Sequence, residues 1–351
     1  MVYMASHTDF QERLQVIHDP VTGVIGIIAI HSTALGPAVG GCRLWHYGTP
    51  SDLTADAVRL ARGMSYKNAM AGLPFGGGKA VLQLPARDYD RTALLRAFAE
   101  SVAALDGQYV TAEDVGTTVT DMKIVRQHTR YVAGLDAELG KAGGDPSPWT
   151  ALGVFEAMKS AAEFCFQADL KGMRVAVQGV GNVGLGLCRL LKGAGASLVI
   201  ADVDDRRAAS AAHDLGATVV DPREIAGVDA DIFAPCALGG ALSHETIPRL
   251  RARLVCGGAN NQLATPADGH GLADRGIAYA PDYVVNAGGI INVAAEYLGE
   301  TSELVSDRVS AIAPRLIRLM EESRLDGLST HVVADRLARR IIAERPLKAA
   351  A

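Results

Sequence analysis

Short apolar runs alternate with amphipathic segments along most of the chain. The run VIGIIAI, from Val24 to Ile30, has the length and β-branching of a buried strand. Between about 54 and 64, apolar residues recur at helical spacing on one face, at Ala57, Leu60, Ala61 and Met64. A strand at 80–84, a helix near 91–104 and a strand at 108–112 follow. This pattern predicts an α/β domain over residues 1–140.

The second half of the chain has a stricter rhythm. After a helix near 151–166, apolar runs predict strands at 173–178, 197–202, 218–220, 231–235, 253–258 and 277–281, with helices at 182–193 and 205–214. This alternation is typical of a parallel, doubly wound sheet, so we predict a Rossmann-like domain over 141–327. The linker GKAGGDPSP at 140–148 separates the two domains. The tail is helical from about 288, and its last helix, within 328–351, could fold back on the first domain.

Composition agrees with two globular domains and limits the partners. The 351 residues exceed the range of about 250–300 in which a single core is usual. With 49% hydrophobic and 21% charged residues, a largely disordered chain is excluded. The net charge of −5 lacks the basic excess that nucleic-acid binding needs. We therefore expect no nucleic-acid partner.

Nothing in the sequence predicts membrane insertion, secretion or a metal site. The most apolar run, Val24 to Ile30, is far shorter than a membrane span, and the N-terminal stretch MVYMASHTDFQERLQ carries charge where a signal peptide has an apolar core. The five cysteines are scattered and never form C-x-x-C, which predicts neither a disulfide framework nor a zinc site. We expect a cytoplasmic protein.

A glycine-rich turn predicts a dinucleotide site. The stretch GVGNVG reproduces G-x-G-x-x-G at the end of a predicted strand and the start of a helix, and its candidate contacts are Gly179, Gly181, Asn182, Val183 and Gly184. There, backbone amides and the helix N-terminus can meet a pyrophosphate. Asp202, at the end of the next strand, has the place of a ribose-binding carboxylate, which favours NAD over NADP. Arg206 and Arg207 could still accommodate a 2′-phosphate, and the turn could also be purely structural.

Two lysines and an aspartate are the candidate catalytic groups. Lys67 and Lys79 lie in the apolar, glycine-rich segments GMSYKNA and GLPFGGGKA, and Asp114 lies in TAEDVG. A second cation nearby and loss of water both disfavour the ammonium form of a lysine, so it can then act as a base near neutral pH. The three glycines before Lys79 suggest backbone packed tightly against a ligand. The alternatives are surface lysines with apolar stems, and a turn or helix-cap role for Asp114.

These segments resemble a known family. The stretches LGPAVGGCR (35–43), GMSYKNAMAGLPFGGGKAV (63–81), YVTAEDVGTTVTDM (109–122), VAVQGVGNVG (175–184), IFAPCALGG (232–240), GGANNQL (257–263) and APDYVVNAGGIINV (280–293) are similar to the leucine, phenylalanine, valine and glutamate dehydrogenases. The resemblance runs from about 20 to about 345, in the order of the family, and is closest to the leucine enzymes. It implies reversible oxidative deamination of an L-amino acid to a 2-oxo acid and ammonium, with NAD as the cofactor, and a homo-oligomer.

The resemblance also implies roles for individual residues. Lys67 would pair with the substrate carboxylate, Lys79 would be the base that activates water, and Asp114 would exchange protons with the amino group. Gly40 and Gly41 would let the backbone approach the substrate. The further cofactor contacts would be Asn260, Ala237 and Thr150. Asn260, Asn261 and Asn286 could instead be left-handed turn residues, as is common for Asn beside Gly.

The implied side-chain pocket is apolar throughout. Its residues would be Val39, Met64, Ala112, Ile290 and Val293, and none offers the cation or hydroxyl that a glutamate side chain needs. Ala112 with the branched Ile290 and Val293 favours leucine, with valine and isoleucine next and phenylalanine as the alternative. Each residue could also be ordinary core.

Two other function classes are consistent with such a fold. A nucleotide-binding protein that has lost its chemistry is disfavoured because Lys67, Lys79 and Asp114 are all present. A 2-hydroxy-acid dehydrogenase would normally need a His and Arg pair, and no histidine lies in the glycine-rich segments.

Overall fold

The computed structural model describes residues 12–86, 88–137 and 139–344, and these divide into two compact units. Unit 1 takes the described residues of Met1–Gly144, Val293–Thr301 and Ala338–Ala351, and unit 2 takes Asp145–Asn292 and Ser302–Leu337. This division differs from the predicted ranges 1–140 and 141–327 because two late segments join unit 1. Part of the predicted last helix, residues 345–351, lies outside the described residues.

Unit 1 is built on a six-stranded mixed sheet in the order β1-β2-β5-β3-β6, with β4 paired to β5. Its elements are β1 (Arg13–Asp19), β2 (Val24–Ser32), β3 (Ala38–Val39), β4 (Cys42–Trp45), α1 (Pro50–Ala71), β5 (Gly76–Gln83), α2 (Arg91–Ala103), β6 (Tyr109–Val110) and α3 (Val119–Arg126). β1, β2 and β5 are antiparallel neighbours, whereas β3 and β4 run parallel to β5 and β6 runs parallel to β3. The predicted strands at 24–30, 80–84 and 108–112 and the helix near 91–104 correspond to β2, β5, β6 and α2.

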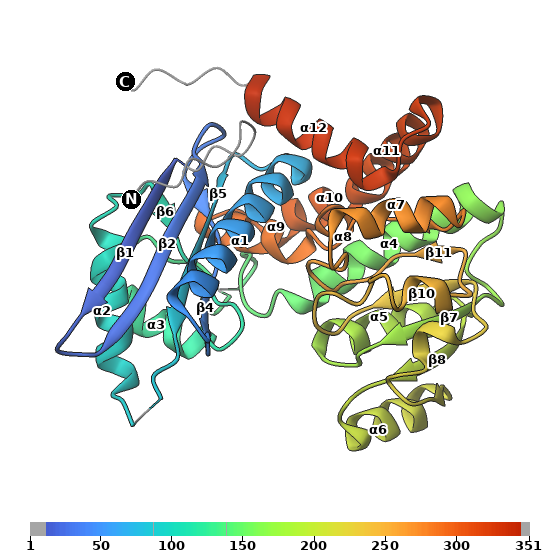
Figure 1. Ribbon diagram of the computed structural model, residues 1–351, viewed down its shortest axis with the longest axis horizontal. Coiled ribbons are helices and arrows are strands. Elements are labelled where there is room, and N and C mark those ends of the chain that lie inside the picture. Colours follow the sequence, from blue (N-terminus) through green and yellow to red (C-terminus); the bar gives the residue numbers. More distant parts are fainter. Residues whose placement is uncertain (1–11, 87, 138, 345–351) are drawn as a thin grey trace. The chain divides into compact units, whose positions relative to one another are not determined.

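Alternation of side chains along the strands places helices on both faces of this sheet (Figure 1). Ile27, Ala29 and Val81 pack with the apolar face of α1. The intervening residues, among them Ile28, Ala80 and Leu82, pack with α2. Lys79 has the same parity as Val81, so its side chain belongs to the α1 face of β5.

Helix α1 begins earlier than its apolar periodicity predicted. The Thr49 hydroxyl accepts a hydrogen bond from the Asp52 amide, the Asp52 carboxylate accepts one from the Thr49 amide, and Pro50 occupies the first turn. This capping box starts the helix four residues before the predicted position of 54. Gly72, with a φ of 70°, ends it.

The glycines before Lys79 form part of strand β5 and not a turn. A Cβ on Gly77 would lie 2.0 Å from the Ser65 amide nitrogen of α1, and one on Gly76 would lie 1.9 Å from the Ser32 carbonyl oxygen of β2. The tight packing therefore exists, but against the protein's own backbone, and the expectation that these glycines pack against a ligand is wrong. The absent side chain of Gly77 lets α1 lie close to β5 two residues before Lys79.

Unit 2 contains a six-stranded parallel sheet in the order β12-β11-β10-β7-β8-β9. Its elements are α4 (Ser147–Phe166), β7 (Arg174–Gln178), α5 (Asn182–Gly193), β8 (Ser197–Ala201), α6 (Asp205–Leu215), β9 (Thr218–Val219), β10 (Ile232–Pro235), β11 (Leu254–Val255), α7 (Pro266–Asp274), β12 (Ala278–Tyr279), α8 (Asp282–Val285), α10 (Ser302–Ser310) and α11 (Ile312–Asp326), with short 3-10 turns at Ile225–Gly227 and Ile247–Arg249. The strand order reverses between β7 and β10, and ligands of doubly wound sheets bind at such a switch point.

Two helices contribute residues to both units: α9 (Gly288–Tyr297) and α12 (Thr330–Glu344). Within unit 1, the α12 residue Arg339 donates from Nε to the Tyr66 hydroxyl of α1 at 2.8 Å. The described end of the last helix, from Ala338, belongs to unit 1. No helix in the described part of the chain is long and apolar enough to cross a membrane.

The packing of Gly77 predicts a contrast between two glycine substitutions. Gly77→Ala should lower the free energy of unfolding by about 3 kcal/mol, because its methyl group overlaps the α1 backbone. Gly63→Ala, within α1 and with no heavy atom within 4 Å of its added Cβ, should raise it by about 0.5–1 kcal/mol. Urea unfolding followed by circular dichroism measures both, and equal stability of the two variants would contradict the packing argument.

Candidate active site

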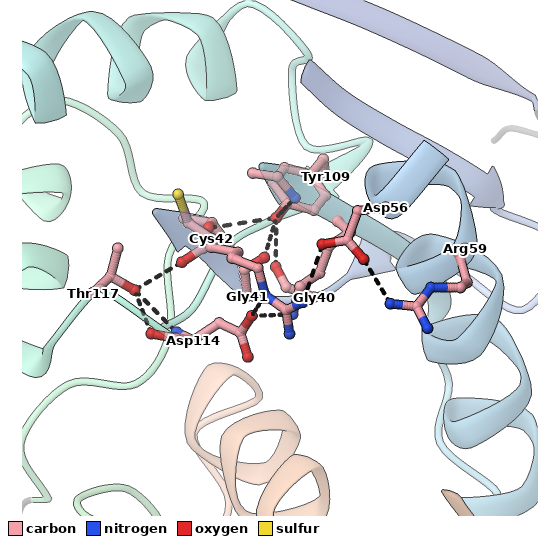
Figure 2. A network of polar contacts seen from close by, with 12 residues as sticks. Gly40, Gly41, Cys42, Asp56, Arg59, Tyr109, Asp114 and Thr117 are labelled. Atoms are coloured by element: carbon pink, nitrogen blue, oxygen red, sulfur yellow. Dashed lines mark hydrogen bonds and ion pairs between the residues drawn. The ribbon is translucent and has the colours of Figure 1, made fainter. Parts of the chain in front are cut away.

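A buried ion pair between Lys79 and Asp114 is the charged centre of the candidate site in unit 1. The Lys79 side chain is 6% exposed, and its Nζ lies 3.0 Å from Oδ2 of Asp114. The lysine is held in β5, whereas Asp114 lies in a turn that is closed by two hydrogen bonds to Thr117. The Asp114 N–H donates to the Thr117 hydroxyl, and the Asp114 carbonyl accepts from the Thr117 N–H, both at 2.9 Å. The Thr117 hydroxyl also donates to the Cys42 carbonyl of β4 at 2.8 Å (Figure 2). Asp114 is therefore both a turn residue and an ion-pair partner, because the turn directs its carboxylate toward Lys79.

A third charged residue, Arg43, was not among the predicted site residues. Its Nε lies 3.0 Å from the same Oδ2 of Asp114, and its Nη1 lies 3.1 Å from Oδ2 of Asp56. The sequence does contain a signal for it, because Arg43 is a charged residue directly after the apolar, glycine-rich stretch LGPAVGGC. The sequence alone does not show that Arg43 pairs with Asp56 and Asp114, so its charge could not be given a role.

The cations keep Asp114 ionised. Burial alone would raise the pKa of its carboxyl group, but the charges of Lys79 and Arg43 and their hydrogen bonds outweigh burial and lower it. Burial also raises the pKa of Cys42 and of Tyr109, the buried neighbours, so both stay neutral near pH 7. The centre is thus one carboxylate between two cations.

The two glycines predicted to approach the substrate line this centre. A Cβ on Gly40 would lie 1.8 Å from the Gly78 carbonyl oxygen and 3.2 Å from Cγ of Met64. A Cβ on Gly41 would lie 2.9 Å from Cβ of Asp114. The Tyr109 hydroxyl donates to the Gly40 carbonyl at 2.5 Å and accepts from the Ala80 amide at 3.1 Å, which fixes the bend between β3 and β4 (Figure 2).

The other predicted substrate residues of unit 1 belong to the same elements. Val39 is paired with both Gly77 of β5 and Val110 of β6, and Ala112 accepts from the Cys42 amide at 2.8 Å through its carbonyl. Lys67 is half-buried on α1, three residues after Met64, which puts the two on neighbouring positions of one helix face. Val293 is buried in the α9 part of unit 1, whereas Ile290 belongs to unit 2.

In unit 2 the glycine motif forms the tight turn that its pattern predicted. Gly179 has a φ of 93°, and a Cβ there would lie 2.9 Å from Cβ of Ala237. A Cβ on Gly184 would lie 1.9 Å from the Gly179 carbonyl oxygen, so this glycine brings α5 against the turn. Gly181 caps α5 without a side-chain hydrogen bond, and no heavy atom lies within 4 Å of its added Cβ. Asn182 and Val183 begin the helix, whose amide end is thus open to an anion.

Asp202 is held by the glycine-rich turn and by the start of α6. Its Oδ2 accepts from the Val180 amide at 2.8 Å, its Oδ1 accepts from the Asp204 amide at 2.9 Å, and Arg207 lies 3.3 Å from Oδ1. Burial raises the pKa of this carboxyl group, but the hydrogen bonds from the two amides and the charge of Arg207 outweigh burial. The net pKa is lowered, and the group is ionised. The carboxylate therefore stands at the end of β8, next to the motif, as the sequence predicted.

The remaining cofactor candidates have different surroundings. Ala237 directly contacts the motif at Gly179. Asn260 accepts from the Asn286 side-chain amide at 2.8 Å, and only Asn261 of the three asparagines has a left-handed backbone, with a φ of 51°. Thr150 lies on α4, where its hydroxyl donates to the Pro146 carbonyl at 3.1 Å. Its hydroxyl is thus engaged within its own helix.

A glycine motif at the switch point of unit 2 and a buried lysine–carboxylate pair in unit 1 are features expected of an oxidoreductase with a nucleotide-binding domain. A model of the Glu/Leu/Phe/Val dehydrogenase dimerisation domain matches residues 8–131, and a model of Glutamate/Leucine/Phenylalanine/Valine dehydrogenase matches residues 145–207 and 200–326. The chain belongs to this family and is an amino-acid dehydrogenase.

Its relatives cover nearly the whole chain. It is 48% identical over 328 residues to a leucine dehydrogenase of Geobacillus stearothermophilus, covering 93% of this chain and 89% of that one. It is 45% identical over 331 residues to a valine dehydrogenase of Streptomyces virginiae, covering 93% and 92%. The crystal structure of L-tryptophan dehydrogenase from Nostoc punctiforme is 42% identical, with a TM-score of 0.82 over 95% of this chain and 96% of that one.

The lowered pKa of Asp114 predicts how its contribution to stability depends on pH. A carboxyl group whose pKa is lower in the folded state stabilises the fold above its unfolded-state pKa of about 3.9, and loses this effect as the pH falls through the folded-state value. The difference in unfolding free energy between wild type and Asp114→Asn should therefore be largest at neutral pH and shrink below about pH 4.

Urea unfolding at a series of pH values measures this difference. Asp136→Asn is the matched control, because Asp136 forms an exposed ion pair with Lys123 and should change stability by less than about 1 kcal/mol. A difference for Asp114→Asn that stays constant from pH 7 to pH 3 would show that its charge is not what stabilises the fold.

Proposed function

We propose that the chain catalyses the reversible oxidative deamination of an apolar L-amino acid, leucine above others, to the 2-oxo acid and ammonium, with NAD as cofactor. The observation that carries this proposal is the buried Lys79–Asp114 pair beside the glycine bend at 40–41. An amine at this place meets a carboxylate that can take its proton, and a lysine that can take a proton from water. The identities to leucine and valine dehydrogenases support the same reaction.

The motif of unit 2 has the features that NAD requires. NAD, when bound, accepts the hydride from the α-carbon of the amino acid. The open helix end at Gly181 would meet the pyrophosphate, and Asp202 would accept hydrogen bonds from ribose hydroxyls. Because Asp202 is ionised, it would repel a 2′-phosphate, and Arg207 is already drawn toward Asp202. These charges favour NAD over NADP.

The charged residues of unit 1 would act on the substrate in turn. Lys67 would hold the carboxylate, and Asp114 would accept the proton that the amino group must lose before hydride departs. Loss of hydride gives an iminium carbon, to which Lys79 would deliver water by accepting one of its protons at Nζ. Lys79 must have lost its own proton to solvent before this step, because an ammonium nitrogen has no lone pair with which to accept one.

Selection among amino acids would rest on the apolar lining. Val39, Met64, Ala112, Ile290 and Val293 offer no charge or hydroxyl for a glutamate side chain. One methylene in such a pocket changes binding by about 1–3 kcal/mol, so leucine, isoleucine and valine would differ modestly. Phenylalanine stays the alternative, and the similar tryptophan dehydrogenase makes a second aromatic amino acid worth comparing.

We also infer a homo-oligomer that assembles through unit 1. The family model over residues 8–131 is described as a dimerisation domain. Strand β1 lies at the edge of the unit 1 sheet, and it exposes Leu14 and Val16 by 47% and 69%. An exposed, apolar edge strand is suited to pairing with a second copy.

A substrate panel tests the proposed function. L-leucine should give the highest kcat/KM for NADH formation at alkaline pH, with L-valine and L-isoleucine within about 200-fold and L-glutamate lowest. L-phenylalanine and L-tryptophan test the width of the pocket, and NADP in place of NAD tests the role of Asp202. Preference for glutamate would overturn the assignment of the lining, and preference for an aromatic substrate would replace leucine by the alternative.

Replacing the proposed base separates chemistry from cofactor binding. Lys79→Ala should lower kcat by about 100- to 10,000-fold, the usual contribution of a general base, and leave the Kd for NADH nearly unchanged because Lys79 lies in unit 1. Lys123→Ala removes an exposed lysine of the same unit and should have wild-type activity. Substantial turnover by Lys79→Ala would refute the assigned base.

A further inference from the structure

Two cations bind one and the same oxygen of Asp114. Nζ of Lys79 and Nε of Arg43 each lie 3.0 Å from Oδ2. Among the described residues, none donates a hydrogen bond to the other oxygen, Oδ1. The two oxygens of this carboxylate are therefore unequal: one is held by two positive charges and the other is available to a ligand.

Arg43 is itself held from behind by a second carboxylate. Its Nη1 lies 3.1 Å from Oδ2 of Asp56 on α1, and the same oxygen accepts from the Tyr47 hydroxyl at 2.6 Å. The Asp56 and Arg43 side chains are only 13% and 19% exposed. Burial and the hydrogen bond to Asp56 raise the pKa of Tyr47, so its hydroxyl keeps its proton and continues to donate. The guanidinium is thus fixed at both ends, between Asp56 of α1 and the turn that carries Asp114.

We propose that Arg43 is a positioning residue of the reaction, which holds Oδ2 of Asp114 so that Oδ1 exchanges the proton with the amino group of the substrate. This inference rests on the proposed role of Asp114 in the deamination. Arg43 touches neither substrate nor cofactor in this scheme and acts only through Asp114.

The planar guanidinium is suited to this task. It donates in two fixed directions, to Asp114 from Nε and to Asp56 from Nη1, whereas an ammonium group is a single point charge on a flexible stem. A carboxylate held by Lys79 alone could rotate about its Cβ–Cγ bond and exchange its two oxygens. Arg43 removes this freedom, so the accepting oxygen is in place before the substrate arrives.

Arg43 also keeps the carboxylate charged when Lys79 changes its protonation state. The groups that face Asp114 are Lys79 of β5, Arg43 and the neutral Cys42 of β4, and the neutral Tyr109 of β6. When Lys79 is neutral, Arg43 is the cation still bonded to Oδ2. Without it, burial would favour protonation of Asp114, and the acceptor for the amine proton would be lost.

The test compares Arg43→Met with Arg43→Lys. Arg43→Met should lower kcat by about 10- to 100-fold with KM for the amino acid within about threefold, because the acceptor is misplaced while Lys67 still holds the substrate. The acidic limb of the kcat/KM profile should move to higher pH by about one pH unit, since loss of a cation favours the protonated form of its neighbours. Arg43→Lys should return the limb to the wild-type position but recover kcat only in part.

The control and the second measurement separate positioning from a structural role. Arg59→Gln removes the exposed cation that also pairs with Asp56, 2.8 Å from Oδ1, and should leave both kcat and the pH profile unchanged. Urea unfolding followed by circular dichroism shows that each variant is folded. In an Asp114→Asn background, Arg43→Met should cause no more than about twofold further loss, because Arg43 acts only through the charge at 114.

Two results would overturn the inference about Arg43 alone. One is an unchanged kcat and pH profile in Arg43→Met while Asp114→Asn is impaired. The other is a full additional loss in the double variant. Wild-type turnover by Asp114→Asn is distinguishable from both, because it would refute the proposed role of Asp114 and with it this inference.

Discussion

The buried contact between Lys79 and Asp114 is the interaction on which the rest of unit 1 depends. An unpaired charge in this position would cost several kcal/mol, so each partner must be present and correctly aimed. The sheet supplies this aim: β5 carries the lysine, β4 carries Arg43, and the turn after β6 carries the aspartate. Gly77 of β5 serves the same end, since its missing side chain lets α1 approach the strand that presents the lysine.

Glycine has two different physical uses in this protein. At Gly76 and Gly77 an added Cβ would collide with backbone about 2 Å away, and the residue type is required by internal packing. At Gly181 an added Cβ would meet nothing within 4 Å, and the absent side chain leaves the helix end open. A glycine-rich sequence therefore does not by itself indicate a ligand, and only the surroundings of each glycine distinguish packing from binding.

Local patterns predicted most of the fold, and pairings distant in sequence were the part that they could not supply. Helix α5 occupies the predicted residues 182–193, because a strand, a glycine turn and an amphipathic segment are adjacent in sequence. The start of α1 was placed too late although Thr49, Pro50 and Asp52 carry the capping signal. Arg43 was missed for a different reason. Its meaning depends on Asp56 and Asp114, and only the folded sheet brings these three residues together.

The separation of charge from apolar lining explains how one scaffold can serve several amino acids. Lys67, Lys79 and Asp114 would address the carboxylate and amine that every L-amino acid shares, so they give no discrimination between side chains. Discrimination would then come from the proposed lining, such as Ala112 and Val293, where each methylene is worth only about 1–3 kcal/mol. Leucine, valine and tryptophan dehydrogenases can therefore share 42–48% of their residues with this chain and still differ in substrate. A substitution in the charged centre leaves a buried charge unpaired and is strongly destabilising, whereas an apolar substitution in the lining changes the free energy much less. Substrate preference can therefore vary while the chemistry stays the same.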